Sequence, residues 1–457
     1  MWKNEAKKLA GTTVLTDSEN TLKMREEILL LCEKYFNNAH AKKDFIPGES
    51  VIAASSKVLR KEDLTSMVDA CLDLWLTAGR YADKFEKNLA KAFGSKFSSL
   101  TVSGSAANLL AFSSLTSEYL GKKRIKPGDE IITVAAGFPT TVAPIIQNNC
   151  IPVFLDVEIE TANIDVRLLN KALTKKTKAV MLAHTLGNPF NLKVITKFCK
   201  DNDLFLIEDC CDAFGSKYNK KTVGSFGQFA TLSFFPAHHI TTGEGGAVLY
   251  NEYKFKRIVE SFRDWGRDCY CKTGLSNTCR KRFDWQLGNL PRGYDHKFIY
   301  SHIGYNMKMT DIQAALGYSQ VQKVEEFINK RKSNFHYLNN KFLENNLDKY
   351  FILPEKYKES DPSWYGYLLT IRENCNFSRK EIINFLESKK ILMRLLFAGN
   401  LTKQPGFMNS KFRIVGSLDN TDKIMNDSFW IGVWPGLDNR HLDFVTDSIK
   451  KFVSSRK

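Results

Sequence analysis

Leu204-Phe-Leu-Ile-Glu-Asp-Cys-Cys-Asp212 joins an apolar run to a group of carboxylates and thiols. The run is short and uncharged, which is typical of a buried strand. Similar runs stand at residues 130–134, 151–157 and 179–183, and stretches with helical periodicity, such as 192–201, lie between them. Strands and helices that alternate in this way build a largely parallel sheet covered on both faces. The sequence therefore predicts an α/β fold.

The chain divides into three parts. Residues 61–310 carry the alternating pattern and are predicted to form one large domain, while residues 1–60 are predicted to form an N-terminal helical arm. Helical periodicity from about 310 to 345 indicates a linking helix. Strand-like and helical segments follow, including a strand expected at 392–397. We expect residues 311–457 to contain this helix and a small C-terminal α+β domain.

Composition excludes several classes of protein. The 457 residues carry a formal net charge of +16, but the basic residues are spread out and form no nucleic-acid-binding arm. A solvated basic surface and the steering of an anionic substrate or redox partner both remain open. The N-terminus lacks the apolar region of a signal peptide, and no run approaches the about 20 apolar residues of a membrane span. We expect a cytoplasmic protein without nucleic-acid or membrane partners, whose ten cysteines are thiols or metal ligands.

Two segments have the character of a ligand site in an α/β sheet. Asp209 ends the apolar run at 204–207, and the carboxyl ends of parallel strands are where such sheets bind ligands. Small residues, Gly104, Ser105 and Ala106, precede a helical pattern, so their N–H groups could bind a phosphate. A plain helix cap explains the same three residues equally well.

A third segment holds two adjacent histidines. It reads Ser233-Phe-Phe-Pro-Ala-His-His-Ile-Thr-Thr-Gly-Glu-Gly-Gly246. Together with Phe138-Pro139, Glu208-Asp209 and Gly304-Tyr305-Asn306, it resembles the nucleotide-sugar aminotransferase family, in which a lysine holds pyridoxal phosphate as a Schiff base. The lysine of that family lies six residues before the glutamate of the Gly-Glu-Gly-Gly turn, and that position is His238 here.

Histidine at this position changes the expected chemistry. An imidazole moves protons but cannot replace the lysine amine in a Schiff base. The resemblance therefore implies that the chain holds pyridoxamine phosphate (PMP) without a covalent bond, uses His238 as its base and is not a transaminase. The neighbour, His239, falls where the family commonly has asparagine.

The resemblance also implies a fold and a set of cofactor contacts. The large domain would be of the fold-type I, aspartate aminotransferase-like class. Phe138 would stack on the cofactor ring, Asp209 would pair with its nitrogen so that the ring accepts electrons, and Asp212 would approach its hydroxyl. Ser233 would bind the phosphate. Asn306 would reach the phosphate from a second subunit, which makes the expected assembly a homodimer.

Three further cysteines stand close together. Cys269, Cys271 and Cys279 form a C-x-C-x₇-C pattern among polar residues, and Cys211 lies well upstream. Four thiolates are what a 2Fe-2S cluster requires. Zinc is the main rival, although structural zinc sites rarely have a single residue between two cysteines. Three free thiols on a loop are the simplest reading.

With His238, these cysteines resemble the PMP- and iron–sulfur-dependent 3-dehydrases of 3,6-dideoxyhexose biosynthesis, which act on CDP-4-keto-6-deoxyglucose for lipopolysaccharide O-antigen. The resemblance covers nearly the whole chain and points to Cys211, not Cys210, as the fourth cluster ligand. It implies dehydration at C3 of the sugar, with His238 as base. It further implies an NADH-dependent reductase, carrying flavin and its own iron–sulfur centre, as electron donor. The chain itself lacks a Gly-x-Gly-x-x-Gly dinucleotide fingerprint.

Other functions compete with this one. The first is a cluster-free 3-dehydratase that acts on GDP-4-keto-6-deoxymannose, against which the four cysteines weigh. The second is a non-catalytic PMP- or zinc-binding regulatory protein, which would have no need of Asp209 and Ser233. A true aminotransferase would require another lysine, such as Lys217. Arg394 is either a surface residue or a contact to the substrate diphosphate.

Overall fold

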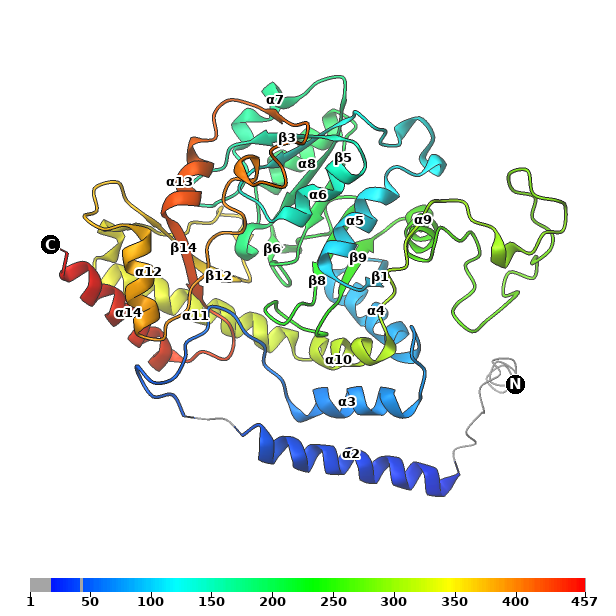
Figure 1. Cartoon of the computed structure of the whole chain (residues 1–457), viewed down its shortest axis with the longest axis horizontal. Helices are drawn as coiled ribbons and strands as arrows, with labels where there is room; N and C mark the ends of the chain where they lie inside the picture. Colours follow the sequence, from blue (N-terminus) through cyan, green and yellow to red (C-terminus); the bar gives the residue numbers. More distant parts are fainter. Residues whose placement is uncertain (1–17, 42–43, 457) are drawn as a thin grey trace.

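The structure, a computed structural model, describes residues 18–41 and 44–456. Residues 1–17, which include the first part of the predicted arm and the segment without signal-peptide character, lie outside the described residues. Figure 1 shows a central sheet between helices, with a smaller layer near the C-terminus. The helices are α2 (Glu19–Ala39), α3 (Lys61–Leu72), α4 (Arg80–Phe93), α5 (Gly104–Ser114), α6 (Pro139–Gln147), α7 (Leu169–Ala172), α8 (Leu192–Asp201), α9 (Tyr253–Arg263), α10 (Asp311–Val321), α11 (Val324–Glu344), α12 (Arg379–Ser388), α13 (Asp419–Asp427) and α14 (Asn439–Ser454).

The central sheet has eight strands in the order β1-β9-β8-β5-β4-β2-β3-β13. The pairs from β8 through β5, β4, β2 and β3 to β13 are parallel, and β9 runs antiparallel to both β8 and β1. The sheet is therefore mostly parallel, as the apolar runs predict. Its strands are β1 (Phe97–Thr101), β2 (Glu130–Val134), β3 (Ile151–Leu155), β4 (Thr177–Ala183), β5 (Phe205–Asp209), β8 (Phe229–Ser233), β9 (Gly246–Tyr250) and β13 (Arg413–Ile414).

Successive side chains of the central strands enter two separate cores. On β2, Ile131 packs into one apolar cluster and Ile132 into the other, and both are fully buried. Side chains that alternate across a strand explain this division. One cluster takes side chains from α5, α6 and α9, and the other takes side chains from α4, α8, α10 and α11. Both faces of the sheet are therefore covered by helices, which explains why the strands are apolar throughout.

A smaller sheet lies toward the C-terminus. Its strands are antiparallel in the order β10-β12-β14, and α11, α12 and α14 contribute to the apolar cluster beside it. A third sheet, β11-β6-β7, is made of two-residue strands. These strands are β10 (Phe351–Ile352), β12 (Gly366–Ile371), β14 (Ser428–Gly432), β6 (Lys217–Tyr218), β7 (Lys221–Thr222) and β11 (Ser360–Asp361).

The described part of the N-terminal arm is a helix on the surface. No residue of α2 is buried, and Figure 1 shows it lying along α3. Arg25 fastens it, because the guanidinium pairs with Asp69 at 2.7 Å and with Asp73 at 2.9 Å. The arm is therefore docked by ion pairs more than by apolar packing.

Two sequence predictions differ from the structure. The strand expected at 392–397 does not form, because only Arg394 pairs with β14, through an isolated bridge to Trp430. The linking helix is two helices, α10 and α11, which Gln322 and Lys323 separate. Within 18–41 and 44–456, no helix combines the length and apolar character needed to cross a membrane.

Candidate active site

The start of α5 and the end of β8 approach each other closely. The Ser103 hydroxyl caps α5 by accepting the Ala106 N–H at 3.0 Å. A Cβ atom on Gly104 would lie 2.4 Å from the Ser233 Cβ, so only glycine fits there. The structure thus brings the predicted phosphate residues Gly104, Ser105, Ala106 and Ser233 to one helix N-terminus, whose free N–H groups favour an anion.

Asp209 ends β5 as a buried carboxylate with defined donors. Asn108 Nδ2 and the Thr141 hydroxyl donate to its Oδ2 at 2.8 and 2.7 Å, and the Cys211 N–H donates to Oδ1 at 3.1 Å. Its exposed fraction is 4%. These bonds hold the carboxylate at the edge of the sheet where the sequence predicts it. Asn108 and Thr141 were not predicted, because each comes from a helix whose approach the sequence pattern does not reveal.

Phe138 presents an aromatic ring at the same edge. It precedes α6 and is 48% exposed, which is unusual for a phenylalanine held in a structured segment. Its only ring neighbour among the described aromatic pairs is Phe397, in edge-on contact at 6.1 Å between centroids. The ring therefore retains free surface for a planar ligand, as the stacking role requires.

His238 lies beside Asp212 and Tyr365. Its Nδ1 is 3.4 Å from Asp212 Oδ1, a distance of an ion pair and not of an aligned hydrogen bond, so this buried Nδ1 has no hydrogen-bond partner. The Tyr365 ring is 5.3 Å away between centroids. His239 points elsewhere, with Nε2 at 2.8 Å from the Ser363 carbonyl. The two adjacent histidines therefore have different surroundings, and the one beside Asp212 is His238.

Asn306 is held at the surface. It forms an isolated bridge with Asp264, and Lys308 Nζ lies 3.3 Å from its Oδ1. The following residue, Met307, accepts the Val102 N–H at 3.0 Å, which ties this segment to β1. The exposed side chain is free to meet a second subunit, but its role in a partner's site stays a prediction.

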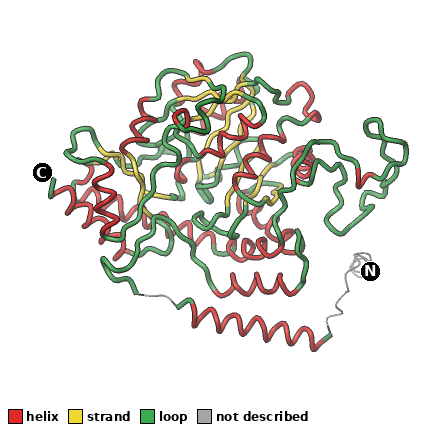
Figure 2. The backbone as a smooth tube through the Cα atoms, in the orientation of Figure 1, coloured by secondary structure: helices red, strands yellow, loops and turns green. Residues whose placement is uncertain are grey.

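The three clustered cysteines lie on a long excursion between α9 and α10. Figure 1 shows this excursion projecting beyond α9, and Figure 2 shows that it is almost entirely loop. Cys269, Cys271 and Cys279 line one small pocket together with His296. The pKa of the Cys271 thiol is lowered from its usual value. Burial acts against this shift, but hydrogen bonds, chiefly from Thr278, outweigh burial.

Cys211 lies apart from this pocket. A Cβ atom on Gly104 would lie 3.1 Å from the Cys211 Sγ, which places this thiol beside the phosphate residues. Burial and the neighbouring Asp209 raise its pKa well above the usual value. The structure thus brings three of the predicted cluster ligands together and leaves the fourth beside the predicted phosphate residues.

The comparisons with known proteins decide the family. Residues 58–450 match the DegT/DnrJ/EryC1/StrS aminotransferase family. The chain belongs to this family. It is similar to the lipopolysaccharide biosynthesis protein RfbH of Salmonella typhimurium, with 54% identity over 94% of this chain and 98% of the relative. It is also similar to dTDP-4-dehydro-2,6-dideoxy-D-glucose 3-dehydratase of Saccharopolyspora spinosa, with 46% identity over 97% and 95%.

A solved structure has the same fold. Escherichia coli GDP-4-keto-6-deoxy-D-mannose-3-dehydratase, with bound hydrated PLP, gives a TM-score of 0.78 at 27% identity over 87% of this chain and 98% of that chain. The fold-type I, aspartate aminotransferase-like prediction is confirmed. The predicted resemblance to nucleotide-sugar aminotransferases is confirmed at the level of the family.

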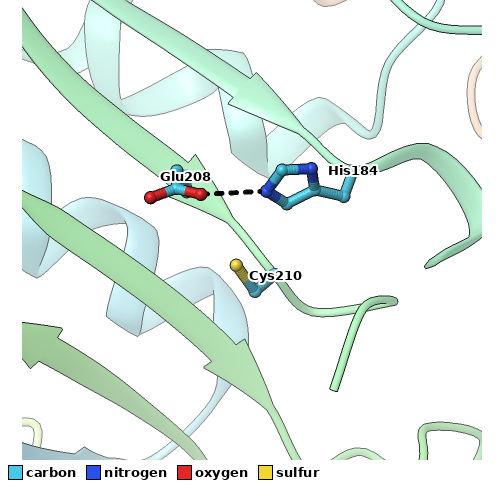
Figure 3. Close-up of side chains that lie close together, drawn as sticks. All are labelled: His184, Glu208 and Cys210. Atoms are coloured by element: carbon cyan, nitrogen blue, oxygen red, sulfur yellow. Dashed lines mark hydrogen bonds and ion pairs between the residues drawn. The ribbon is translucent and has the colours of Figure 1, made fainter. Parts of the chain in front are cut away.

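A buried His-Glu-Cys group in this family member has a structural explanation. Figure 3 shows His184, Glu208 and Cys210, with the histidine Nε2 at 3.2 Å from Glu208. The carboxylate also accepts three backbone N–H groups at 2.7–2.8 Å, from residues 224, 226 and 227. Because the carboxylate is fully hydrogen-bonded without an ion, the group fixes the end of β5 next to Asp209 and needs no metal.

Proposed function

We propose that this protein removes the C3 hydroxyl of a nucleotide-4-keto-6-deoxyhexose as a PMP-dependent 3-dehydrase. The observation that carries the proposal is that His238 occupies the position of the family's Schiff-base lysine and lies beside Asp212. Lys217, the alternative lysine, is exposed on β6, a strand that pairs with β11 outside the central sheet. Because Asp209 ends a strand of the central sheet, this position disfavours Lys217 as a Schiff-base lysine and so disfavours an aminotransferase. The sequence similarity to two 3-dehydratases supports the same reaction class.

The predicted site residues fit PMP. The helix N-terminus at Gly104, together with Ser233, would hold the phosphate. Phe138 offers ring surface, and the hydrogen-bonded Asp209 would keep the ring nitrogen protonated. Bound PMP supplies an amine that condenses with the sugar ketone and a ring that accepts electrons.

His238 would take the proton from the cofactor methylene. An imidazole is suited to this step, because its ordinary pKa lies near the working pH and it needs no covalent bond. Asp212, at 3.4 Å from Nδ1, would orient the ring and stabilise its charge after it accepts the proton. Once Nδ1 faces Asp212, the opposite nitrogen, Nε2, is the one available to the methylene.

The substrate and setting are also proposed. We infer CDP-4-keto-6-deoxyglucose as the substrate and lipopolysaccharide O-antigen synthesis as the setting. The similarity to the lipopolysaccharide biosynthesis protein RfbH supports the setting, whereas the two similar dehydratases carry dTDP- and GDP-sugars in their names, so the nucleotide rests on the sequence resemblance alone. None of the ten cysteines is paired in a disulfide, which favours the reducing cytoplasm. Completion of the phosphate site by Asn306 would require a homodimer.

Reduction of the dehydrated sugar needs electrons from outside the chain. We propose that an NADH-dependent flavin and iron–sulfur reductase delivers them to a 2Fe-2S cluster on the loop after α9. Three thiols in one pocket support a metal centre, but the predicted fourth ligand, Cys211, does not line that pocket. The three-thiol pocket fits a four-thiolate cluster only in part, and zinc remains the rival occupant.

Anaerobic purification followed by analysis of iron, sulfide, zinc and PMP tests the proposal. We expect PMP released intact on denaturation, about two irons and two sulfides per chain, and little zinc. PMP without iron would support the cluster-free 3-dehydratase that acts on GDP-4-keto-6-deoxymannose, the sugar nucleotide that the name of the E. coli structure carries. Zinc without PMP affinity would indicate the non-catalytic reading and refute the proposed function.

A further inference from the structure

Arg331 of α11 is a fully buried cation that forms no ion pair among the described residues, although the carboxylate of Asp212 is near enough to favour its charged form. It has no exposed surface and belongs to no ion pair of the part of the chain that is described. Its Nη1 donates to the carbonyl oxygens of Trp364 and Tyr365 at 3.4 and 3.2 Å. Its Nε and Nη2 are buried and unpaired. Because unpaired charged donors are costly to bury, this site calls for another acceptor.

His239 supplies an unpaired acceptor nearby. Its Nε2 lies 2.8 Å from the Ser363 carbonyl, and a carbonyl only accepts, so the ring proton is on Nε2. The other nitrogen, Nδ1, is then an acceptor, and it is buried without a partner. Burial, followed by the charge of Arg331, holds the pKa of His239 well below its usual value.

One small cavity joins these groups. It has a volume of about 10 Å³ and is lined by His238, His239 and Arg331 among others. This is about the volume that one water molecule needs, and a buried water makes two to four hydrogen bonds. A water here can accept hydrogen bonds from Nε and Nη2 of Arg331 and donate one to Nδ1 of His239. It would satisfy these three unpaired atoms and leave His238 Nδ1 unpaired.

Residues 363–365 connect Arg331 with both histidines. The Ser363 carbonyl accepts from His239, the Tyr365 ring lies 5.3 Å from the His238 ring, and Arg331 donates to the two carbonyls that follow Ser363. The guanidinium thus fastens the segment against which both imidazoles rest. A change at Arg331 would release this segment, and with it His238, while the predicted phosphate residues and Asp209 keep their own hydrogen bonds.

We propose that Arg331 is a positioning residue for His238. It acts through the 363–365 segment and through one buried water that it shares with His239 Nδ1. The proposal rests on the proposed function, because it assigns His238 the role of the base. It adds Arg331, a residue of α11 that follows the other proposed site residues in the sequence, to those that the reaction requires.

The test compares Arg331→Met and Arg331→Lys in the PMP-loaded protein. We expect Arg331→Met to bind PMP normally and to exchange the PMP methylene hydrogen about tenfold more slowly, because the base is displaced. Arg331→Lys keeps a donor and a charge and should recover most of the rate. Lys332→Met is the matched control, since Lys332 is the next residue and, within the described part of the chain, pairs with the exposed Asp361 alone, at 2.6 Å.

A measurement on the native protein needs no variant. Long-range ¹⁵N–¹H NMR of labelled histidine should show the His239 proton on Nε2, and a high-resolution crystal structure should show one water in the cavity. A proton on Nδ1, an empty cavity, or unchanged exchange in folded Arg331→Met would each overturn the proposal, as would a rate loss matched by lost PMP binding. Native protein that binds PMP without any methylene exchange would instead refute the proposed function.

Discussion

The imidazole of His238 has one acidic neighbour and one aromatic neighbour. Asp212 lies 3.4 Å from Nδ1 and Tyr365 lies 5.3 Å from the ring, so the side chain is oriented without being locked by a hydrogen bond. A general base needs this combination, because it must be aimed at a proton and still be free to accept it. The predicted carboxylate and phosphate residues would bind the cofactor independently of it.

We predict that His238→Asn loses proton removal from the cofactor methylene and keeps PMP binding. The loss should be of roughly 10² to 10⁴-fold, the range for a general base. Solvent tritium exchange at the PMP methylene measures it, with PMP affinity as the control. Near-normal exchange in the variant would assign the base to another residue.

A second prediction concerns Thr141, whose hydroxyl donates to Asp209 at 2.7 Å. Thr141→Val keeps the shape and removes the donor, so the free energy of unfolding should fall by about 1.5–3 kcal/mol, the usual range for a hydrogen bond to a charged group. Denaturant unfolding of the variant and of Thr141→Ser, which keeps a hydroxyl, checks this. If Thr141→Val were as stable as the native protein, water would be replacing the hydrogen bond to Asp209.

At the scale of elements, the parallel strands allow part of the candidate site to be predicted from the sequence. Asp209 follows an apolar run, and such strand ends meet at one edge of the sheet, so its place could be foreseen. Asn108 and Thr141 could not, because their bonds depend on how α5 and α6 pack. The strand expected at 392–397 failed for a related reason: its apolar residues pack as a loop with a single bridge. Arg331 reaches the site only through the tertiary fold.

We predict that Cys269→Ser, Cys271→Ser and Cys279→Ser each remove or destabilise the metal centre, and that Cys211→Ser does so if this thiol is the fourth ligand. Cys210→Ser is the matched control, since Cys210 is fully buried beside Gly224 and away from the loop. Iron content and dehydration are measured separately. Dehydration should survive better than deoxygenation, because only the second needs electrons; equal loss of both would make the cysteines structural.

The docking of α2 should be sensitive to acid. Burial opposes ionisation of Asp69, but hydrogen bonds from Arg25, Tyr81 and Arg80 outweigh it and lower its pKa from 3.8 to about 2. Because the folded pKa is below the unfolded value, the stabilisation is present above about pH 4 and is lost as the pH falls toward 2. The protection factor of the α2 amides, which is the measured exchange rate divided into the intrinsic rate at the same pH, should fall in that window, and Asp69→Asn should show the lower protection at neutral pH. A protection factor independent of pH would assign the docking to apolar contacts.

At the scale of the whole molecule, several apolar side chains are exposed on the excursion between α9 and α10. Ile303 is 96% exposed and directly precedes the Gly304-Tyr305-Asn306 segment, and Tyr300 and Phe298, each 53% exposed, stand four and six residues before Gly304. Apolar surface of this kind is commonly covered by another chain. It supports the proposal that Asn306 completes the phosphate site of a second subunit.

Mixed dimers test this shared site. Chains with His238→Asn and chains with Asn306→Ala should each be inactive alone. After dissociation and re-pairing, one site of each mixed dimer has both native residues, so some activity should return. No recovery after proven re-pairing, or an active species that sediments as a monomer, would contradict the shared site.

The fate of the sugar oxygen at C3 tests the central claim most directly. PMP-loaded protein is incubated in ²H₂O, anaerobically, with CDP-4-keto-6-deoxyglucose labelled with ¹⁸O at C3, with and without glutamate. We predict release of the label as water, deuterium at the PMP methylene, and no amino sugar in either reaction. An amino sugar that retains the C3 label would show transamination and contradict the role assigned to His238.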